Sequence, residues 1–277
     1  MPTAIPDHPA PRFSVITVCL NAGATIEQTI RSVLDQNVPH LEYIIIDGGS
    51  TDSTLEVIDR HRARLARVVS EPDDGLYDAM NKGIRLATGD LVGLVNADDF
   101  LEPGALATVA SARAAHPEAD LYHGHMRMID PSSGIRYVVR KKPDVRASRW
   151  REIPILHPAT FVTRALYDRI GLYDTPFRIA ADYEFALRAI ACGARFHHVD
   201  AIISNMRQGG VSTRNYLRSF REARRARLAH GCPRPFADAF FLRSVALFLT
   251  VHRLGRARPF QALYARWKTS RNRVERD

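Results

Sequence analysis

Residues 93–100, with the sequence GLVNADDF, carry the clearest chemical signal in the chain. Apolar and small residues lead into this stretch, which predicts a strand buried on both faces, and Asn96, Asp98 and Asp99 follow without a spacer. Carboxylates at the end of a buried strand are costly to desolvate unless something neutralises them. A divalent cation that bridges to a phosphate-bearing ligand would do so, because Mg²⁺ prefers one or two carboxylates together with substrate phosphates. The other interpretation is an ordinary turn, in which Asp is common.

A second set of polar residues indicates that this edge of the sheet binds a ligand. Runs that read as strands alternate with helical patterns over residues 24–35 and 53–65, which is typical of an α/β protein with a mostly parallel sheet and helices on both faces. The carboxyl ends of parallel strands lie along one edge, where such sheets bind ligands. Polar residues follow three further strands: Asn21 after 13–20, Asp47 at the end of 42–47, and EPDDG (71–75) after 67–70.

Length, composition and cysteine content bound the class of protein. With 277 residues, 45% hydrophobic and 25% charged, the chain suits one large soluble domain, or one domain with an appendage. Its 3 cysteines show no CxxC spacing, which favours a reducing compartment over a disulfide framework or a zinc site. The N-terminal stretch lacks the apolar segment of a signal peptide, and no run of 18 apolar residues occurs. We therefore expect a cytoplasmic protein with a disordered arm over residues 1–12.

Positive charge is concentrated towards the C-terminus. Residues 214–277 contain 16 Lys and Arg against 4 Asp and Glu, a net charge of +12, whereas the whole chain carries +9. A basic segment of this kind indicates an anionic partner. Residues 236–254 combine an aromatic-rich apolar pattern with arginines, which fits a helix on anionic lipid, and no nucleic-acid motif is recognisable. We expect residues 236–258 to contact the inner face of the cell membrane; packing on the body of the protein or in a homodimer interface is the alternative.

Phosphate-binding glycine loops are missing from the sequence. Neither GxGxxG after the first strand nor GxxxxGK[ST] occurs. This disfavours a dinucleotide-dependent dehydrogenase and a P-loop enzyme. An anionic ligand would therefore be held by a metal and side chains rather than by a glycine loop at a helix N-terminus.

Several motifs together resemble the family-2 glycosyltransferases. The stretch EPDDGLYDAMNKG resembles a subgroup found in bacterial surface-polysaccharide pathways. The resemblance implies a GT-A fold and an inverting enzyme that uses a nucleotide-diphosphate sugar. The motifs are Asn21 after the first strand, DGGSTD over residues 47–52, EPDDGLYDAMNKG over 71–83, ATGD over 87–90 and NADD over 96–99.

The resemblance, together with the basic C-terminal segment, predicts how the chain is divided. A catalytic domain would cover residues 13–213, and a basic, amphipathic helical tail would cover 214–277. Within the catalytic domain, the donor half would span roughly 13–100 and the acceptor half roughly 101–213.

Roles for individual residues on the donor side also follow from the resemblance. Asp47 would bind the nucleotide base, most often uracil, and Thr17 and Asn21 would line the base and ribose pocket. Asp98 would coordinate Mg²⁺ or Mn²⁺ on the diphosphate. Asn96 occupies a position where the family usually has Asp, so we expect weaker metal binding rather than its loss. The other residues that would border the ribose, sugar or diphosphate are Asp73, Asp74, Asn81, Lys82 and, on a mobile loop over 207–212, Arg207.

Inversion needs a base that takes the proton of the acceptor hydroxyl. Residues 179–191 have the apolar stripe of a helix, and Asp182 lies in its first turn, where the helix macrodipole favours a carboxylate. Family members place their base in an equivalent acidic motif that opens a helix, so the resemblance assigns this role to Asp182, with Glu184 as the alternative. His157, in the stretch LHPATF, resembles a position that lines the acceptor pocket; a purely structural His is the alternative.

These features discriminate between three functional classes. A metal-dependent glycosyltransferase is favoured, and the absence of the Gln-x-x-Arg-Trp motif of processive synthases favours transfer of one sugar to a saccharide or polyprenyl-linked acceptor. A sugar nucleotidyltransferase would need a Gly-rich loop bearing Lys or Arg after the first strand, and that loop is absent. A non-catalytic nucleotide-sugar binding protein would not need the carboxylates of Asp98 and Asp182.

Overall fold

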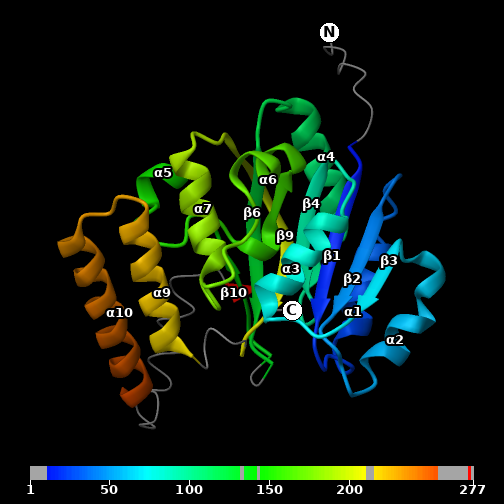
Figure 1. The fold of residues 1–277 in the computed structure, drawn as a ribbon, viewed down its shortest axis with the longest axis horizontal. Coiled ribbons are helices and arrows are strands. Elements are labelled where there is room, and N and C mark those ends of the chain that lie inside the picture. The colour runs from blue at the N-terminus through cyan, green and yellow to red at the C-terminus, as the bar shows by residue number, and fades with distance from the viewer. Residues whose placement is uncertain (1–10, 132–133, 142–143, 210–214, 255–273, 276–277) are drawn as a thin grey trace.

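The structure is a computed structural model, and it describes residues 11–131, 134–141, 144–209, 215–254 and 274–275. Helices and strands alternate along the first half of the chain (Figure 1), as the sequence predicts. The strands are β1 (Phe13–Cys19), β2 (Glu42–Asp47), β3 (Arg67–Ser70), β4 (Leu91–Asn96), β5 (Phe100–Leu101), β6 (Leu121–Ile129), β7 (Arg136–Val139), β8 (Thr160–Thr163), β9 (Phe196–Arg207) and β10 (Val274–Glu275). The α-helices are α1 (Ile26–Leu34), α2 (Thr54–Arg60), α3 (Leu76–Leu86), α4 (Ala105–Ala115), α5 (Val145–Ser148), α6 (Arg164–Ile170), α7 (Ala181–Ala191), α9 (Tyr216–Ala229) and α10 (Arg234–Leu254), and the short 3-10 helices are η1 (Arg62–Arg64) and η2 (His157–Ala159).

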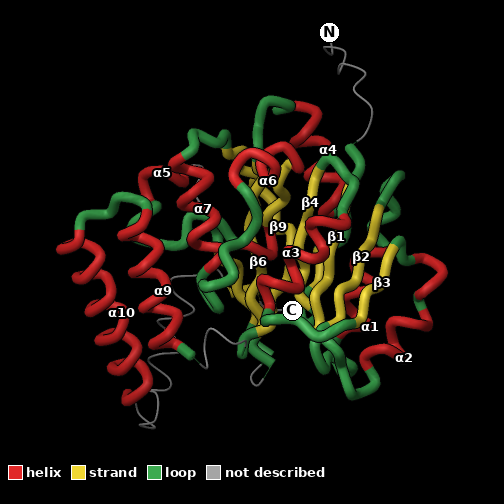
Figure 2. Tube along the Cα trace, viewed as in Figure 1, coloured by secondary structure: helices red, strands yellow, loops and turns green. Residues whose placement is uncertain are grey.

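The ten described strands form one mixed sheet in the order β10-β7-β6-β8-β4-β1-β2-β3, with β9 paired to β5 and β6. Strands β1 to β4 run parallel to one another. In this register Cys19 pairs with Asp47, Asp47 with Ser70, and Val18 with Asn96. The four strands therefore end at one level. The loops that follow them lie together at the lower edge of the sheet in Figure 2.

Helices cover both faces of the sheet because β1 alternates its buried side chains between two apolar clusters. Ile16 and Val18 pack with α3, α6 and α7, whereas Phe13 and Val15 pack with α1, α2 and α4. Helix α3 comes close to the sheet through Gly83, where a Cβ atom would lie 2.4 Å from Ile16 Cγ2. Complete burial of one such Ile stabilises the fold by roughly 1.5–3 kcal/mol.

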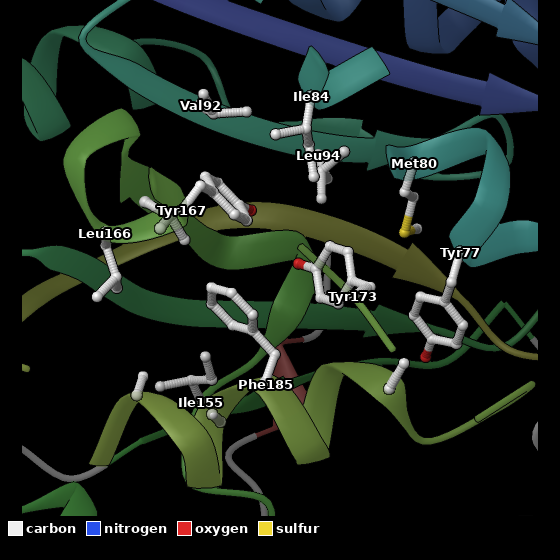
Figure 3. Packing of buried hydrophobic residues seen from close by; sticks show 14 of the residues in the cluster. Tyr77, Met80, Ile84, Val92, Leu94, Ile155, Leu166, Tyr167, Tyr173 and Phe185 are labelled. Carbon is white, nitrogen blue, oxygen red and sulfur yellow. The ribbon is translucent and has the colours of Figure 1, made fainter. Parts of the chain in front are cut away.

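Aromatic rings within the cluster that contains Ile16 and Val18 join α3 to α7 (Figure 3). The Tyr173 ring lies 5.4 Å from Tyr77 on α3 and 5.1 Å from Phe185 on α7, measured between ring centroids. Stacked and tilted aromatic pairs at such distances contribute about 0.5–1.5 kcal/mol beyond their buried area. The contact fixes the start of α7 relative to the start of α3.

The second half of the sheet is built from antiparallel pairs and one long parallel pair. Strand β8 lies antiparallel between β4 and β6, and β6 pairs antiparallel with β7. Strand β9 runs parallel to β6 and also pairs with β5, where Phe100 faces Asn205. This pairing returns the end of β9 to the loop that follows β4.

The two C-terminal helices form a layer beside α7 (Figure 1). Helix α9 packs on α7, and α10 packs on α9 through the rings of Tyr216 and Phe248, which stack 3.7 Å apart. The opposite side of α10 exposes apolar residues, including Phe236 (62% exposed) and Leu242 (64% exposed). Among the described residues, no helix is both long and apolar enough to cross a bilayer.

Candidate functional site

The loops after β1 and β2 are tied to each other at the carboxyl edge of the sheet. Asn21 has a left-handed backbone (φ 51°), which Asn tolerates better than most residues. Its Oδ1 accepts a hydrogen bond from the Thr51 N–H at 2.9 Å, and its own N–H donates to Ser50 Oγ at 2.7 Å. Asn21 therefore lies on this edge, as predicted, and its hydrogen bonds hold the loops after β1 and β2 together.

Asp47 lies at the same edge but is completely buried. Its carboxylate accepts hydrogen bonds from the N–H groups of Gly49 (3.1 Å) and Ser50 (3.0 Å) and from Ser70 Oγ (2.7 Å). Burial alone would raise the pKa of Asp47, but the hydrogen bonds from Ser50 and Ser70 outweigh it and lower the pKa below its usual range. The carboxylate is thus ionised and orders the turn after β2, rather than pointing outward at a ligand.

Asp73 and Lys82 lie beside that turn. Asp73 Oδ1 accepts a hydrogen bond from the Gly75 N–H at 2.7 Å, and Gly48 packs against its other oxygen, since a Cβ atom on Gly48 would lie 2.3 Å from Oδ2. Lys82 Nζ lies 2.9 Å from both Glu71 Oε1 and the Pro72 carbonyl oxygen. Asp74 is exposed at the same loop. The structure therefore brings Asp73, Asp74 and Lys82 to one edge with Asn21.

Asp98 and Asp99 have different surroundings. Asp99 is buried and accepts hydrogen bonds from Asn96 Nδ2 (3.1 Å) and from the Arg207 N–H (3.2 Å). Burial, together with the neighbouring charge of Asp98, raises the pKa of Asp99 to about 8. The Asp98 carboxylate is partly exposed at the edge and has no hydrogen-bond partner within the described residues.

The residues around Asp98 fit a hard cation. Asn96 Oδ1 is buried and lacks a hydrogen-bond partner within the described ranges. A partner-free amide oxygen near a partner-free carboxylate suits Mg²⁺ or Mn²⁺, provided that a bound diphosphate supplies further ligands. No group of three or more His, Cys, Asp or Glu residues in the described part of the chain could hold a metal by itself.

Arg207, at the end of β9, is brought to the same place. Its guanidinium donates to the Asp98 carbonyl oxygen and to Gln28 Oε1, and it lies 5.3 Å from the Phe100 ring centroid. The sequence places Arg207 on a mobile loop over 207–212; residues 210–212 of that loop lie outside the described residues.

Two other predicted donor residues lie in the core of the protein. Thr17 is buried in β1, where its hydroxyl shares a 2.9 Å hydrogen bond with the Tyr43 hydroxyl. Asn81 is buried in α3, and its amide bonds both the N–H (3.0 Å) and the carbonyl oxygen (2.9 Å) of Tyr173. Both side chains point into the core because their strand or helix turns that face inward. Neither side chain lines the edge of the sheet; each forms its hydrogen bonds within the core.

Asp182 lies in the first turn of α7. Its Oδ1 accepts hydrogen bonds from the Tyr183 N–H (2.8 Å) and from the Tyr77 hydroxyl (3.2 Å). Tyr77 belongs to α3, which begins just after Asp73 and Asp74. The Arg178 guanidinium, just before α7, also lies close to Gly75. The carboxylate predicted to be the base is therefore held next to the loop of Asp73 and Asp74.

His157 and Asp182 line one small cavity, together with Thr160 and Tyr173. Burial lowers the pKa of His157, and the charge of Asp182 opposes this effect. His157 Nε2 is buried and has no hydrogen-bond partner among the described residues. The structure thus brings the predicted acceptor residue and the predicted base together.

Glu184, the alternative base, is occupied by other contacts. It is buried and pairs with Arg188 (2.9 Å) and with His230 of the segment after α9 (2.9 Å). Its geometry suits a structural ion pair, so Asp182 is the better candidate.

Sequence reasoning missed Tyr77 and Glu222. Tyr77 lies within the 71–83 motif but was assigned no role. Glu222 is the only acidic residue in the basic stretch 216–230, which is a weak signal, and its carboxylate accepts hydrogen bonds from the N–H groups of Ile179 and Ala180. His123, His125 and His198, which lie near one another, do not form a metal site within the described residues.

Solved structures share this fold. The chain aligns with S. aureus TarS 1-349 in complex with UDP-GlcNAc at a TM-score of 0.61 and 19% identity, covering 84% of this chain and 71% of that one. It aligns with the mannosyltransferase PcManGT from Pyrobaculum calidifontis in complex with GDP-Man and Mn2+ at a TM-score of 0.59 and 22% identity, covering 91% and 83% of the two chains. The fold is a GT-A fold, as expected.

Sequence comparison identifies the family. The model of glycosyl transferase family 2 matches residues 14–173. A PGL/p-HBAD biosynthesis glycosyltransferase of Mycobacterium bovis (strain BCG / Pasteur 1173P2) is 34% identical over 210 residues, which cover 73% of this chain and 80% of the relative. The chondroitin synthase of Pasteurella multocida is 26% identical over 209 residues, 74% of this chain but 22% of that protein. The chain belongs to glycosyl transferase family 2, and it is a glycosyltransferase.

Proposed function

We propose that this protein transfers one sugar, with inversion, from a nucleotide-diphosphate sugar to a saccharide or polyprenyl-linked acceptor in cell-surface polysaccharide synthesis. A UDP-sugar is the donor that the family resemblance favours. The observation that carries the proposal is the hydrogen bond between Tyr77 and Asp182, because it holds a carboxylate beside the loop of Asp73 and Asp74. The similarity to glycosyltransferases named for PGL/p-HBAD and chondroitin synthesis supports a cell-surface glycan as the product.

On the donor side, the ordered turn after Asp47 and the Asn21 loop form the base and ribose site. Asp73, Asp74 and Lys82 border the ribose and the sugar, and Arg207 lies where it can approach the diphosphate. Asp47 acts by fixing the turn, since its Oδ2 accepts hydrogen bonds from Gly49 and Ser70 and its Oδ1 accepts one from the Ser50 hydroxyl.

Asp98, with Asn96, would hold Mg²⁺ or Mn²⁺ against the diphosphate. Such an ion acts as a Lewis acid and a template, and it is worth several kcal/mol in stabilising charge on a leaving phosphate. The Mn²⁺ named for the structurally similar mannosyltransferase supports this assignment. Asn96 contributes a neutral oxygen in place of a carboxylate, which lowers the negative charge of the site.

On the acceptor side, Asp182 takes the proton from the attacking hydroxyl as that oxygen bonds the anomeric carbon on the face opposite the leaving diphosphate. The Tyr77 hydroxyl and the Tyr183 N–H hold one carboxylate oxygen and leave the other for the acceptor. His157, neutral because burial lowers its pKa, offers Nε2 as a hydrogen-bonding group within the same cavity.

We place the reaction at the inner face of the cell membrane. Helix α10 turns an apolar side outward and carries Arg243 on that side, while the neighbouring α9 exposes Arg221. Residues 255–258 of the predicted membrane-contacting stretch lie outside the described residues. An apolar face with arginines fits a lipid surface rich in anionic headgroups.

Thermal denaturation with a panel of nucleoside diphosphates, each with and without Mn²⁺, tests the proposal. A nucleotide present at 100 times its Kd should stabilise the protein by about 2.7 kcal/mol. We expect one nucleotide, UDP, to raise Tm, and to do so more strongly with Mn²⁺. If no nucleoside diphosphate raises Tm with or without the ion, the donor class is wrong.

A further inference from the structure

Glu222 is a buried carboxylate in a helix that is otherwise strongly basic. It lies on α9 and is 7% exposed. Its Oε2 accepts hydrogen bonds from the N–H groups of Ile179 (2.8 Å) and Ala180 (3.1 Å), and its Oε1 accepts one from Arg218 Nε (2.8 Å). One side chain of the C-terminal helices thus binds two consecutive peptide groups of the segment that leads into α7.

That segment carries the proposed base. Ile179 and Ala180 come directly before the first turn of α7, which contains Asp182. The Tyr77 hydroxyl lies 2.8 Å from the Ile179 carbonyl oxygen and 3.2 Å from Asp182 Oδ1. The segment is therefore held from two sides, by Tyr77 of α3 and by Glu222 of α9.

The charge of Glu222 suits this position. Burial would raise its pKa, but the hydrogen bonds from Ile179 and Arg218 outweigh burial and lower it. Glu222 is consequently ionised at neutral pH. A negative charge just before a helix is stabilised by the N-terminal end of the helix macrodipole.

We propose that Glu222 is a positioning residue for transfer, which holds the 179–182 segment so that the Asp182 carboxylate faces the acceptor hydroxyl. Helix α9 is then part of the catalytic unit, although the family model that matches the chain ends at residue 173. The inference rests on the proposed function, since it concerns the base of that reaction.

A positioning role and a purely stabilising role make different demands on the side chain of residue 222. Positioning needs an oxygen at the correct distance from two N–H groups, whereas pairing with Arg218 needs only a negative charge nearby. Gln keeps the length of the side chain and one acceptor oxygen but loses the charge. Asp keeps the charge but withdraws the oxygens by one carbon–carbon bond.

Steady-state transfer by the full-length protein, using the nucleotide sugar that the thermal screen identifies, tests the inference. We expect Glu222→Ala to lower kcat by about 10²-fold, because a small misplacement of a catalytic group has effects of that size. The KM for the donor and the Kd for the nucleoside diphosphate should stay within about two-fold, because the donor edge does not contact Glu222. Arg218→Ala is the matched control, and it should retain wild-type kcat because Glu222 keeps both N–H groups.

The two conservative variants, Glu222→Gln and Glu222→Asp, test the positioning role even if Glu222→Ala fails to fold. Glu222→Gln should retain most of the turnover, and Glu222→Asp should lose most of it, with melting curves showing both variants folded. If Glu222→Asp turns over like the wild type, or if Glu222→Gln loses more kcat than Glu222→Asp, the positioning role is wrong. A wild-type protein that transfers no sugar would instead overturn the proposed function.

Discussion

The neighbouring residues Asp98 and Asp99 follow the end of β4, and their carboxylates make different contacts. Asp99 turns inward, accepts hydrogen bonds from Asn96 and Arg207, and ties β4 to β9. Asp98 stays at the edge without a hydrogen-bond partner in the described ranges. Of the two carboxylates, only that of Asp98 would therefore be available to a cation, and the partner-free oxygen of Asn96 would be the second ligand from the protein.

Replacing Asp98 with Asn should abolish the effect of Mn²⁺ on nucleotide binding. The variant loses the only charged ligand in the proposed ion site, so we expect kcat to fall about 10²-fold or more. Isothermal titration with UDP, with and without Mn²⁺, measures the change. Asp59→Asn, which alters an exposed acid on α2, is the control. An Asp98→Asn variant whose UDP affinity still rises with Mn²⁺ would place the ion elsewhere.

Replacing Asp182 with Asn should lower kcat by about 10²–10⁴-fold, because general-base catalysis contributes that much. The KM for the donor should change little, since the carboxylate acts on the acceptor. Glu184→Gln provides the comparison, because Glu184 is the other carboxylate in the first turn of α7. Turnover that survives Asp182→Asn and is lost in folded Glu184→Gln would move the base to Glu184.

At the scale of elements, the buried contact of Glu184 with Arg188 and His230 joins α7 to the end of α9. Burial alone would raise the pKa of Glu184, but the hydrogen bonds from His230 and Arg188 outweigh it and lower the pKa from its usual 4.5. A depressed carboxylate pKa contributes stability that is fully present above the unfolded-state value and is lost as the pH falls through the folded-state value.

Glu184→Gln should accordingly lower the free energy of unfolding by about 1–3 kcal/mol at pH 7, the usual cost of leaving buried charged partners unsatisfied. The difference from wild type should shrink at pH 4, where the unfolded wild-type chain has begun to bind a proton at this residue. Urea unfolding at the two pH values measures both quantities. The exposed Glu56→Gln should show no such pH dependence; an equal gap at both pH values would contradict the assigned role.

The elements that depend on local sequence could be predicted, and those that depend on distant pairing could not. The strands 42–47 and 67–70 were predicted with the bounds of β2 and β3, because β-branched runs end there in turn-forming residues. No local pattern could show that β9 pairs with both β5 and β6. That pairing decides where Arg207 lies.

The same limit applies to the candidate site. Motif positions predicted which residues gather at the edge, such as Asn21 and Asp98, because the carboxyl ends of parallel strands share a level. They did not predict which side chains face the core. Thr17 and Asn81 were assigned to the donor site, and both are buried with their polar groups satisfied.

At the scale of the whole molecule, charge and apolar surface coincide on the C-terminal helices. Leu242 and Leu249 are exposed on α10, and α9 beside it is basic. Like charges would repel if two copies met through this side, whereas anionic lipid would attract it. Burial of one Leu in the bilayer interface contributes roughly 1.5–3 kcal/mol if it is complete.

The wild-type protein should sediment with vesicles that contain phosphatidylglycerol, and less so as salt screens the arginines. The double variant Leu242→Glu and Leu249→Glu should lose at least about ten-fold in binding, because it removes apolar contact and adds negative charge. Ile153→Glu, which alters an exposed apolar residue outside α10, should bind like the wild type. Unchanged sedimentation of the double variant would rule out this face as the lipid-binding surface.

The hydrogen bonds from Ile179 and Ala180 to Glu222 have a consequence for protein engineering. The donor half predicted for residues 13–100 is contiguous in the sequence, so it could be exchanged with that of a relative to combine one donor specificity with another acceptor specificity. A junction placed between residues 192 and 215 would join the α7 of one parent to the α9 of another and separate these hydrogen-bonding partners. Productive hybrids should therefore inherit residues 174–230 as one block, with the crossover upstream of it.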